Sequence, residues 1–435
     1  MRASFYTLGC KVNQYETQIL KQLFSAQGYD IVAFGESADV CVINSCTVTD
    51  TGDRKNRQAL RRARRENPGA VIALCGCMPQ AFPDQSDLLP EADVVTGAYN
   101  RKGLLDAIRS FMATGERVVD ITKHERGEQF EQMRADAFME HTRAFVKIED
   151  GCERYCSYCI IPTARGPVRS KPLDELRDEL NSLAQAGYRE VVLVGINLSC
   201  YGTDLGLRLI DAVRCAAAIP GIERVRLGSL EPELLTREDI RAMKVLPAFC
   251  PQFHLSLQSG CDQTLRRMNR HYTTAQYMEI VDMIRAEFEN SAITTDIMVG
   301  FPQETDEEFV ESLEFFSAVG FAKAHVFSYS MRAGTRAALI KEQVPQQVKT
   351  TRSRRMLQAA DHARSVFLRT QVGRTEPVLF ETREGGFYSG YTKSYTPVKV
   401  RCPADTCLEG KIVSVKITDV SDDGCIGELE IMAKL

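Results

Sequence analysis

Three cysteines, Cys152, Cys156 and Cys159, stand within eight residues in the run Gly151-Cys-Glu-Arg-Tyr-Cys-Ser-Tyr-Cys159. Thiolates spaced this closely can converge on one metal centre, and a four-iron, four-sulfur cluster usually takes four cysteine ligands. With three cysteines supplied, one iron keeps an open position for a ligand. The alternative is three buried thiols, since free cysteine is often buried in protein cores.

Other metal sites use different spacings. Zinc sites usually combine two separated cysteine pairs, or cysteines with histidines. The chain has only six His, and none lies in this run. Ferredoxin-type runs have another spacing that ends in Cys-Pro. The triplet therefore favours an iron–sulfur cluster over a zinc site.

A second set of cysteines follows short apolar runs near the N-terminus. Three such runs are expected to form buried parallel strands: residues 4–8, 40–43 and 70–74. Cys10, Cys46 and Cys77 each follow one of them. Ligands collect beyond the carboxyl ends of strands in an open parallel sheet, so we expect these cysteines to meet there. Cys41 and Cys75 belong to the apolar runs, and we expect both to pack inside the sheet.

The middle of the chain alternates between strand and helix patterns. Strand candidates are residues 144–148, 191–195, 225–228, 253–257, 295–299 and 325–329, with helical patterns between them such as 173–185 and 275–288. Six strand–helix units predict an incomplete version of the eight-stranded α/β barrel. In such barrels the active site lies at the carboxyl ends of the strands, which is where the Cys152 run begins.

The last part of the chain has a different texture. Short strand patterns separated by glycine occur at residues 378–381, 397–400, 411–417 and 427–432. They predict a small β-barrel. The expected organisation is therefore an open parallel α/β sheet domain at 1–125, a partial (β/α)6 barrel at 138–368 and a β-barrel at 371–435.

Composition restricts the class of protein. The 435 residues are 44% hydrophobic and 26% charged with a net charge of −4, which is ordinary for a globular protein and gives no global attraction to nucleic acid. The N-terminus lacks the apolar region of a secretory signal, and no apolar run is long enough to span a bilayer. The odd count of 15 Cys favours metal ligation in a reducing compartment over disulfides. We therefore expect a cytoplasmic protein with no membrane association.

Four motifs together resemble one enzyme family. The cysteine triplet is similar to the signature of radical S-adenosylmethionine (SAM) enzymes, with Tyr158 at a position that is usually aromatic. Three further blocks resemble the methylthiotransferases within that group: Thr7-Leu-Gly-Cys-Lys-Val-Asn-Gln-Tyr-Glu-Thr17, Asn44-Ser-Cys-Thr-Val48 and Gly76-Cys-Met-Pro-Gln80. The resemblance covers nearly the whole chain. It implies a radical-SAM barrel followed by a TRAM-like β-barrel.

The resemblance also implies the cofactors and their ligands. Two 4Fe-4S clusters are expected, one held by Cys10, Cys46 and Cys77 and the other by the triplet, with SAM on the open iron of the second. Residues expected near SAM lie at strand ends: Tyr158, Gly195, Asn197, Ser229, Glu231, Gln258 and Ser259. Two positions depart from the family pattern. Gly195-Ile-Asn197 replaces a commoner Gly-Glu, and Pro167 stands where another basic residue is expected.

The opening motif most resembles the MtaB branch of the family. That branch adds a methylthio group to N6-threonylcarbamoyladenosine beside the anticodon of tRNA. A sister branch acts on isopentenyladenosine in tRNA, and another acts on an aspartate of a ribosomal protein. Both remain alternatives, as does a non-catalytic iron–sulfur scaffold that binds RNA. A small electron donor of the flavodoxin or ferredoxin type is a further expected partner, and the sequence predicts no oligomeric state.

Basic residues are the candidates for contact with the substrate. Seven of twelve residues from Arg54 to Arg65 are Lys or Arg, and on a helix Arg57 and Arg61 share a side that could contact phosphates. The alternative is a solvated helix surface. Arg165 is a third candidate. The threonylcarbamoyl group carries a carboxylate, for which Lys11, Arg165 and Arg169 are the expected cationic partners.

Overall fold

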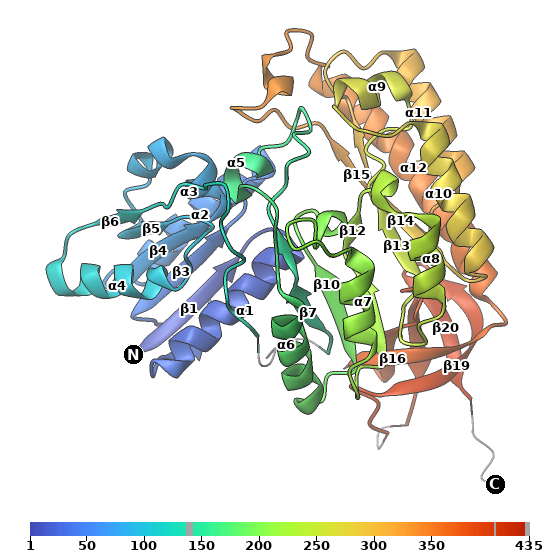
Figure 1. Ribbon diagram of the computed structural model, residues 1–435, viewed down its shortest axis with the longest axis horizontal. Helices are drawn as coiled ribbons and strands as arrows, with labels where there is room; N and C mark the ends of the chain where they lie inside the picture. The colour runs from blue at the N-terminus through green and yellow to red at the C-terminus, as the bar shows by residue number, and fades with distance from the viewer. Residues whose placement is uncertain (136–141, 404–405, 431–435) are drawn as a thin grey trace.

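The computed structural model describes residues 1–135, 142–403 and 406–430. Three parts follow one another along the chain: a parallel sheet with helices, an incomplete barrel and a small closed β-barrel. In Figure 1 the N-terminal part lies at the left, the central part at the right and the C-terminal part below it. This architecture confirms the predicted fold class.

The N-terminal part is built on six parallel strands in the order β2-β1-β3-β4-β5-β6. They are β1 (Arg2–Thr7), β2 (Asp30–Val32), β3 (Val40–Ser45), β4 (Val71–Gly76), β5 (Val94–Thr96) and β6 (Val118–Asp120). The apolar runs predict β1, β3 and β4. They do not predict the other three strands, because three residues are too few to show a periodic pattern.

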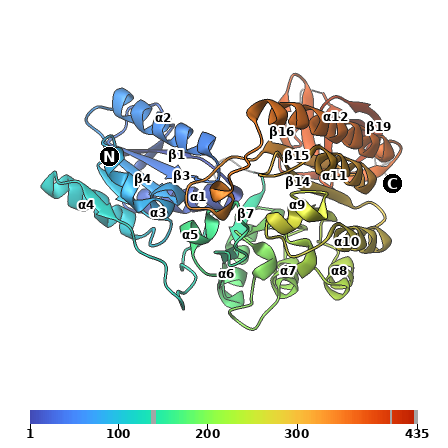
Figure 2. The same cartoon turned by 90° about the horizontal axis from the view of Figure 1, so that it is seen from above.

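Helices cover both faces of this sheet (Figure 2). They are α1 (Lys11–Ala26), α2 (Asp50–Glu66), the short α3 (Cys77–Ala81) with the turn η1 (Pro83–Leu88), and α4 (Gly103–Thr114). Successive strand residues point to opposite faces. Cys75 accordingly packs with the residues of α1 and α4, whereas Cys41 packs with those of α2. Both cysteines are buried strand residues, as predicted.

The central part forms an incomplete parallel barrel. Its strands are β7 (Ala144–Lys147), β10 (Glu190–Val194), β11 (Arg224–Leu227), β12 (Ser229–Leu230), β13 (Gln252–Leu255), β14 (Ala292–Val299) and β15 (Lys323–Ser328). They make two sheets, β11-β10-β7 and β12-β13-β14-β15, and an isolated parallel bridge joins Val225 of β11 to Phe249, three residues before β13.

A helix follows each strand unit on the outside of this barrel. These helices are α6 (Leu173–Gln185), α7 (Leu209–Ala217), α8 (Arg237–Lys244), α10 (Thr274–Glu287), α11 (Asp306–Val319) and α12 (Gln346–Gln371). Capping boxes at Thr236, Thr273 and Thr305 begin three of them and satisfy free backbone N–H groups. Short elements lie in the loops at the upper end of the barrel: β8 (Glu149–Asp150), α5 (Ile161–Arg165), β9 (Arg169–Ser170), η2 (Leu198–Cys200), η3 (Pro232–Leu234), α9 (Asp262–Arg267) and η4 (Arg336–Leu339).

Helix α1 joins the N-terminal part to the barrel. Val12 packs against Val192 of β10, and Tyr15 and Ile19 belong to the main barrel core. Leu20 and Phe24 of α1 pack against the N-terminal sheet instead. The start of α1, with Cys10 before it, is therefore held against the side of the barrel.

The C-terminal part is a closed barrel in the order β16-β17-β18-β20-β19. Its strands are β16 (Thr375–Glu384), β17 (Phe387–Tyr391), β18 (Pro397–Arg401), β19 (Ile412–Ser421) and β20 (Gly424–Leu429). The β17–β18 loop closes the lower end of the central barrel. There Arg226 donates to the carbonyl oxygens of Lys393 (2.9 Å) and Thr392 (3.3 Å), and Arg224 donates to that of Tyr391 (2.9 Å).

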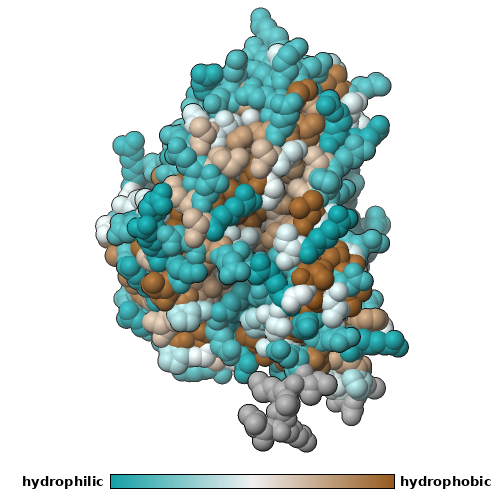
Figure 3. Space-filling view, turned by 90° about the vertical axis from the view of Figure 1, so that its right-hand side faces the viewer, coloured by the Kyte–Doolittle hydropathy of each residue, from teal (hydrophilic) through white to brown (hydrophobic). Residues whose placement is uncertain are grey.

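The outer face of the barrel carries hydrophilic side chains with apolar residues in patches between them (Figure 3). Among the described residues, no helix is both long enough and apolar enough to cross a bilayer.

Candidate functional site

Cys10, Cys46 and Cys77 lie at one edge of the N-terminal sheet. Cys10 stands between β1 and α1, Cys46 follows β3, and Cys77 begins α3 directly after β4. Because β1, β3 and β4 are neighbours in a parallel sheet, their carboxyl ends bring the three thiols together. Gly9, with φ +107°, lies so close to the next loop that a Cβ built on it would be 2.7 Å from the Cβ of Cys46. The predicted meeting of these residues agrees with the structure.

Two buried asparagines hold the loops of the first two cysteines. Asn13 Nδ2 donates to the carbonyl oxygens of Leu8 at 2.7 Å and Ser45 at 3.0 Å, one in each loop. Asn44 Nδ2 donates to the carbonyl oxygen of Asn13 at 3.1 Å. Both asparagines belong to the motifs that carry the family resemblance. Their role in the structure is to fix the relative position of the two loops.

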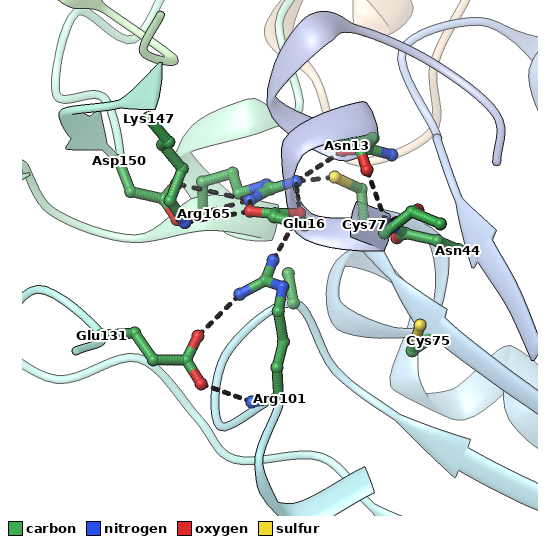
Figure 4. Close-up of polar contacts among 12 residues, drawn as sticks. Asn13, Glu16, Asn44, Cys75, Cys77, Arg101, Glu131, Lys147, Asp150 and Arg165 are labelled. Carbon is green, nitrogen blue, oxygen red and sulfur yellow. Dashed lines mark hydrogen bonds and ion pairs between the residues drawn. The ribbon is translucent and has the colours of Figure 1, made fainter. Parts of the chain in front are cut away.

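Arg165, from α5 of the central part, reaches the third cysteine. Its Nε atom donates to Cys77 Sγ at 3.2 Å, and its Nη2 atom donates to Asn13 Oδ1 at 2.7 Å. Its Nη1 atom lies 2.6 Å from Glu16 Oε1. The guanidinium is thus enclosed by these partners, while Cys75 lies apart from it (Figure 4). Arg165 is 0% exposed, so the prediction that it contacts the substrate directly is corrected: its donors are used inside the protein.

Glu16 and Asp150 connect the two cysteine sets. Lys147 Nζ lies 3.0 Å from Glu16 Oε1 and 2.9 Å from Asp150 Oδ2, and Asp150 stands two residues before the cysteine triplet. Burial acts to raise the pKa of Glu16, but Arg101, Arg165 and Lys147 lower it to about 2. The carboxylate is therefore charged, and its ion pairs hold α1 against the loop that leads to the triplet.

The triplet lies in a loop after β8, at the upper end of the barrel. The backbone N–H of Cys159 donates to the carbonyl oxygen of Cys156 at 3.0 Å, which makes a tight turn. Ser157 between them is held by the end of α9, since its N–H donates to the carbonyl oxygen of Met268 at 2.9 Å. The three thiols are half-buried and therefore reachable from the space above the strands.

Two side chains donate to the sulfur atoms of the triplet. Arg270 Nη1 lies 3.4 Å from Cys156 Sγ, and Asn197 Nδ2 lies 3.7 Å from Cys152 Sγ. Glu231 holds Arg270 in place, with 3.1 Å between Oε1 and Nη1. Hydrogen bonds to cluster sulfurs are one means by which a protein sets a reduction potential. The sequence does not predict Arg270 as a site residue.

The thiols of both cysteine sets have the chemistry that iron–sulfur clusters require. Each cysteine of a four-iron cluster binds a different iron through its thiolate. Burial raises the pKa of Cys77, Cys152 and Cys159 to about 12, so bare thiols keep their protons and a cationic centre stabilises the thiolates. With their Arg and Asn donors, the residues present fit two iron–sulfur clusters.

A cavity of about 540 Å³ lies between the Cys10 loop and the interior of the barrel. Cys10 and Lys11 line it on one side, and Gly195 and Ser229 line it at the strand ends. Inward-facing residues of the barrel strands form its deeper walls, and Tyr395 from the β17–β18 loop reaches it from below. A substrate in this cavity is in contact with the loop of the first cysteine set.

Three of the residues predicted to lie near SAM are placed suitably. Gly195 and Ser229 line the cavity, and Asn197 lies beside Cys152. Glu149 fixes this strand end, since its Oε2 atom accepts from the N–H of Asn197 at 2.7 Å. A Cβ on residue 195 would be 2.5 Å from that same oxygen. Glycine at this position therefore provides room for Glu149, and the strand end keeps a carboxyl group although it departs from the commoner Gly-Glu pattern.

The other predicted SAM residues differ in their surroundings. Gln258 has φ +63° and a buried Oε1 atom without a hydrogen-bond partner among the described residues. Strained backbone with an unpaired polar atom is typical of a ligand site. Tyr158 is packed edge-on against Phe301 at 6.3 Å. Ser259 is fully buried, with its Oγ atom accepting from the N–H of Cys261 at 3.3 Å, and Glu231 is paired with Arg270, so neither faces the cavity.

Of the three predicted partners for a carboxylate, only Lys11 lines the cavity. Arg169 is buried against Glu128 at 3.1 Å and Asp150 at 3.6 Å, and Arg165 is enclosed as described above. Burial, Arg143 and Arg226 together lower the pKa of Lys11 to about 8. Burial is the largest of these causes, and Glu190 and Cys10 oppose the decrease.

The basic run forms helix α2, as predicted. Arg61 has a side chain that is 69% exposed, and its Nε atom lies 3.2 Å from Glu91 Oε1. Arg57 is half-buried, with Nη2 3.4 Å from Gln85 Oε1. The helix begins at Asp50, four residues after Cys46, so its first turns lie close to the first cysteine set.

Several site residues give no signal in the sequence. Glu16, Arg101 and the pair Lys147 and Asp150 come from three separate segments, and charged residues are usually interpreted as surface residues. The motif Cys-Lys-Val-Asn-Gln-Tyr-Glu-Thr contains Glu16, but only the fold shows that this carboxylate is completely buried.

Comparison with known families agrees with the geometry. The model of the radical SAM superfamily matches residues 146–316. A second model, described as uncharacterized protein family UPF0004, matches residues 2–97. The first match includes the barrel strands from β10 to β14, the second includes the strands from β1 to β5 of the N-terminal sheet, and each contains one cysteine set.

Curated relatives match almost the whole chain. The threonylcarbamoyladenosine tRNA methylthiotransferase MtaB of Bacillus subtilis (strain 168) is 36% identical over 95% of this chain and 93% of its own. The protein of the same name from Aquifex aeolicus (strain VF5) is 37% identical over 86% of this chain and 91% of its own. A tRNA-2-methylthio-N(6)-dimethylallyladenosine synthase of Caldicellulosiruptor saccharolyticus is 33% identical over 97% of this chain and 91% of its own.

Solved structures share the fold at lower identity. The radical S-adenosylmethionine methyltransferase TsrM from Kitasatospora setae, with cobalamin and a [4Fe-4S] cluster bound, superposes with a TM-score of 0.58 at 15% identity. The match covers 78% of this chain and 77% of that one. Together, the two family models, the nearly full-length relatives and the two cysteine sets lead to one assignment: the chain belongs to the radical SAM methylthiotransferase family.

Proposed function

We propose that this protein is a tRNA methylthiotransferase that converts N6-threonylcarbamoyladenosine next to the anticodon to its 2-methylthio derivative. The observation that carries the proposal is one polar cavity lined by Cys10 of the first cysteine set and by Gly195, two residues before Asn197, whose Nδ2 atom donates to Cys152 of the triplet. The names of the relatives from Bacillus subtilis and Aquifex aeolicus support the same substrate. The protein works in the cytoplasm, where tRNA is modified.

The residues of the chain have distinct tasks in this reaction. When bound, SAM and the two clusters supply the radical chemistry, the sulfur and the methyl group that replace a hydrogen on carbon. Arg270 and Asn197 donate to the sulfurs of Cys156 and Cys152, which favours the reduced and more negative state of the cluster there. Glu149 holds the strand end at Asn197 in position.

The anticodon loop suits the chemistry of the site. A single-stranded base can be turned out of its stack at lower cost than a paired base, and it can then enter the cavity. Arg57 and Arg61 on α2 contact phosphates of the same RNA, because Arg61 is exposed on this helix and Arg57 is partly so. Arg165 takes no part in this contact and acts instead as a positioning residue for Cys77.

A flavodoxin- or ferredoxin-type protein supplies the electrons. Tyr155, beside Cys156, is 59% exposed and marks the surface nearest to the triplet. Arg336 donates to the carbonyl oxygen of Tyr155 at 2.8 Å, so this surface carries a cation that an electron donor can approach.

A second candidate substrate is isopentenyladenosine in tRNA. It is favoured by the relatives named tRNA-2-methylthio-N(6)-dimethylallyladenosine synthase, which are 32–34% identical to this chain. The aspartate of a ribosomal protein and a non-catalytic scaffold are weaker alternatives. A scaffold does not require an iron with a free coordination position, whereas a four-iron cluster held by the three cysteines of the triplet leaves one iron with such a position.

The experiment that tests the proposal compares tRNA from cells with and without the gene. Mass spectrometry of the nucleosides is expected to show loss of the 2-methylthio derivative of threonylcarbamoyladenosine. The anaerobically reconstituted enzyme is then given two tRNA pools that differ only in the adenosine modification. Turnover confined to isopentenyladenosine would reject the proposed substrate. Absence of SAM cleavage with both clusters present would reject the enzyme altogether.

A further inference from the structure

The interior of the central barrel below the cysteines is polar and charged. The side chains lining the cavity include three cations, Lys11, Arg226 and Lys323, and one carboxylate, Asp296. Barrel interiors of this kind are usually filled with branched apolar residues. The polar lining therefore calls for an explanation in terms of a ligand.

Two of these charged groups have partners inside the protein. Arg226 Nε lies 3.0 Å from Glu190 Oε1, and its other nitrogens bind carbonyl oxygens of the β17–β18 loop. Asp296 is flanked by two histidines, with Oδ2 3.3 Å from His254 Nε2 and Oδ1 3.7 Å from His325 Nδ1. Both have partners without any ligand.

The two lysines have no such partner. The side-chain ammonium groups of Lys11 at the start of α1 and Lys323 at the start of β15 form no hydrogen bond or ion pair with any residue in the described part of the chain. Lys11 Nζ lies over the ring of Phe145, 6.0 Å from its centroid. Both lysines line the same cavity, together with His325.

Further polar groups surround the lysines. Thr294 Oγ1 lies 3.0 Å from His254 Nδ1 and 3.0 Å from Gln252 Nε2, so these three side chains form a short hydrogen-bonded row along β13 and β14. All three line the cavity. Such a row offers donors and acceptors to the hydroxyl and carbonyl groups of a ligand.

We propose that the barrel interior is a carboxylate subsite, in which Lys323 and Lys11 bind the anionic end of the substituent on N6 of the substrate adenosine. The inference rests on the proposed function, which places a modified adenosine in this cavity. It adds the residues that select the modification. The hydrogen-bonded row of Gln252, His254 and Thr294 then accommodates the remaining polar atoms of the threonylcarbamoyl group.

Selection against an apolar substituent follows from the same contacts. An isopentenyl group would displace water from the lysines and the row without replacing its hydrogen bonds, which is costly. Sites built to hydrogen-bond a polar group reject analogues that lack it far more strongly than apolar pockets reject polar ones. A phosphate of the tRNA is the other anion that could reach these lysines, and the test must separate it from the carboxylate.

The test measures binding of three anticodon stem-loop RNAs to the reconstituted holoenzyme without oxygen. The RNAs are identical except at the target adenosine, which carries threonylcarbamoyl, its neutral methyl ester or isopentenyl. The wild-type protein is expected to bind the carboxylate RNA about tenfold to a hundredfold more tightly than the ester, as expected for one charged hydrogen bond. Lys323→Gln should remove most of the preference for the carboxylate RNA over the ester RNA, and Lys323→Arg should restore part of this preference.

Matched variants distinguish loss of the carboxylate subsite from a general loss of RNA binding. Lys244→Gln, on the outer helix α8 where Lys244 is exposed over the ring of Phe288, should keep the wild-type ratio. Lys11→Gln should lower the ratio as Lys323→Gln does, with iron content measured because Cys10 is adjacent. If Lys323→Gln weakens all three RNAs equally, the lysine binds phosphate and the subsite is overturned.

The outcomes for the inference and for the proposed function are distinct. Formation of the 2-methylthio product from threonylcarbamoyladenosine, with equal affinity for acid and ester, would overturn the subsite and leave the function in place. Product formed from isopentenyladenosine RNA alone would overturn the function itself. Product from the threonylcarbamoyl RNA, together with a ratio that Lys323→Gln removes, supports both.

Discussion

The Nε atom of Arg165 lies 3.2 Å from the Sγ atom of Cys77, although the two residues are 88 positions apart and belong to different parts of the chain. The contact joins the radical SAM barrel to a thiol of the N-terminal sheet. Arg165 is also paired with Glu16 and Asp150, so one buried cation touches both structures that carry cysteines. The distance between the two cluster sites thus depends on this side chain.

Arg165→Lys is expected to change the reduction potential of the cluster at Cys77. A hydrogen bond to sulfur favours the more negative, reduced state, and lysine keeps the charge without the Nε contact. The potential of that cluster should therefore fall, while that of the triplet cluster stays unchanged, as measured by EPR during redox titration. Arg101→Lys is the matched control, because Arg101 also pairs with Glu16, at 2.6 Å, and donates no hydrogen bond to sulfur among the described residues.

Removing the charge altogether should have a larger effect on stability. Arg165→Met leaves Glu16 and Asp150 buried with less compensation, and loss of one partner from a buried pair costs about 3–5 kcal/mol.

Equal reduction potentials of the Cys77 cluster in Arg165→Lys and wild type would show that the contact between Arg165 and Cys77 only contributes to packing.

Cys77 and Cys75 should differ sharply, although only one residue separates them. Two clusters correspond to about eight irons per chain. Cys77→Ala should lower the iron content by up to half and abolish sulfur insertion, while reductive cleavage of SAM at the triplet persists. Cys75→Ala should retain both activities, since Cys75 packs with the apolar residues between the sheet and α1. Iron analysis and the yield of 5′-deoxyadenosine are the measurements.

Further outcomes would contradict the ligand assignment. Loss of the cluster in Cys75→Ala but not in Cys77→Ala would show that Cys75, and not Cys77, is the cluster ligand. A wild-type chain that takes up zinc and no iron would reject both clusters. Substitution of Cys152, Cys156 and Cys159 by Ala should abolish SAM cleavage in every case.

The positions of the cysteines can be predicted because the pattern around each is local. Short apolar runs mark β1, β3 and β4, and a thiol directly after such a run lies at the carboxyl edge of a parallel sheet. The incomplete barrel can be predicted for the same reason, since its strands and helices have clear periodicity. β17 gives no comparable pattern, because Phe387–Tyr391 is short and contains glycine.

The partners of the cysteines could not be predicted from local pattern. Glu16, Arg101 and Arg165 look like surface residues in the sequence, and only the packing of α1 between two parts of the molecule buries them. Lys323 likewise appears as a polar residue at the edge of a strand. Its significance depends on the cavity, which residues from the N-terminal, central and C-terminal parts enclose together.

The basic surface of α2 is expected to contribute to tRNA affinity. Changing Arg57 and Arg61 together to Glu should weaken binding and reduce the slope of log affinity against log salt by about 1 for each phosphate that is no longer neutralised. Fluorescence anisotropy over a range of salt concentrations measures both. The double variant Arg237→Glu/Arg241→Glu on α8 is the control, since Arg241 is likewise exposed and paired, with 3.0 Å to Glu287. Equal affinity in wild type and the α2 variant would show that α2 is only a solvated face.

Glu149 should make stability depend on pH. Burial, followed by the charge of Asp150, raises the pKa of this carboxyl well above its usual value. The folded state therefore holds a proton that the unfolded chain releases. The stability from this group is present below the unfolded pKa and is lost as the pH rises through the folded pKa.

Glu149→Gln is expected to remove this loss of stability at rising pH. Glutamine cannot ionise, yet its amide oxygen can still accept from the N–H of Asn197, as Glu149 Oε2 does at 2.7 Å. The free energy of unfolding of the variant should exceed that of wild type increasingly with pH, by up to about 1.4 kcal/mol per unit for one proton. Urea denaturation curves recorded about one pH unit apart, between about pH 5 and pH 9, measure the difference in the free energy of unfolding. Glu279→Gln, at an exposed position on α10, should give a curve parallel to wild type. If Glu149→Gln is parallel as well, Glu149 is charged in the folded protein, and another group near Asn197 must stabilise it.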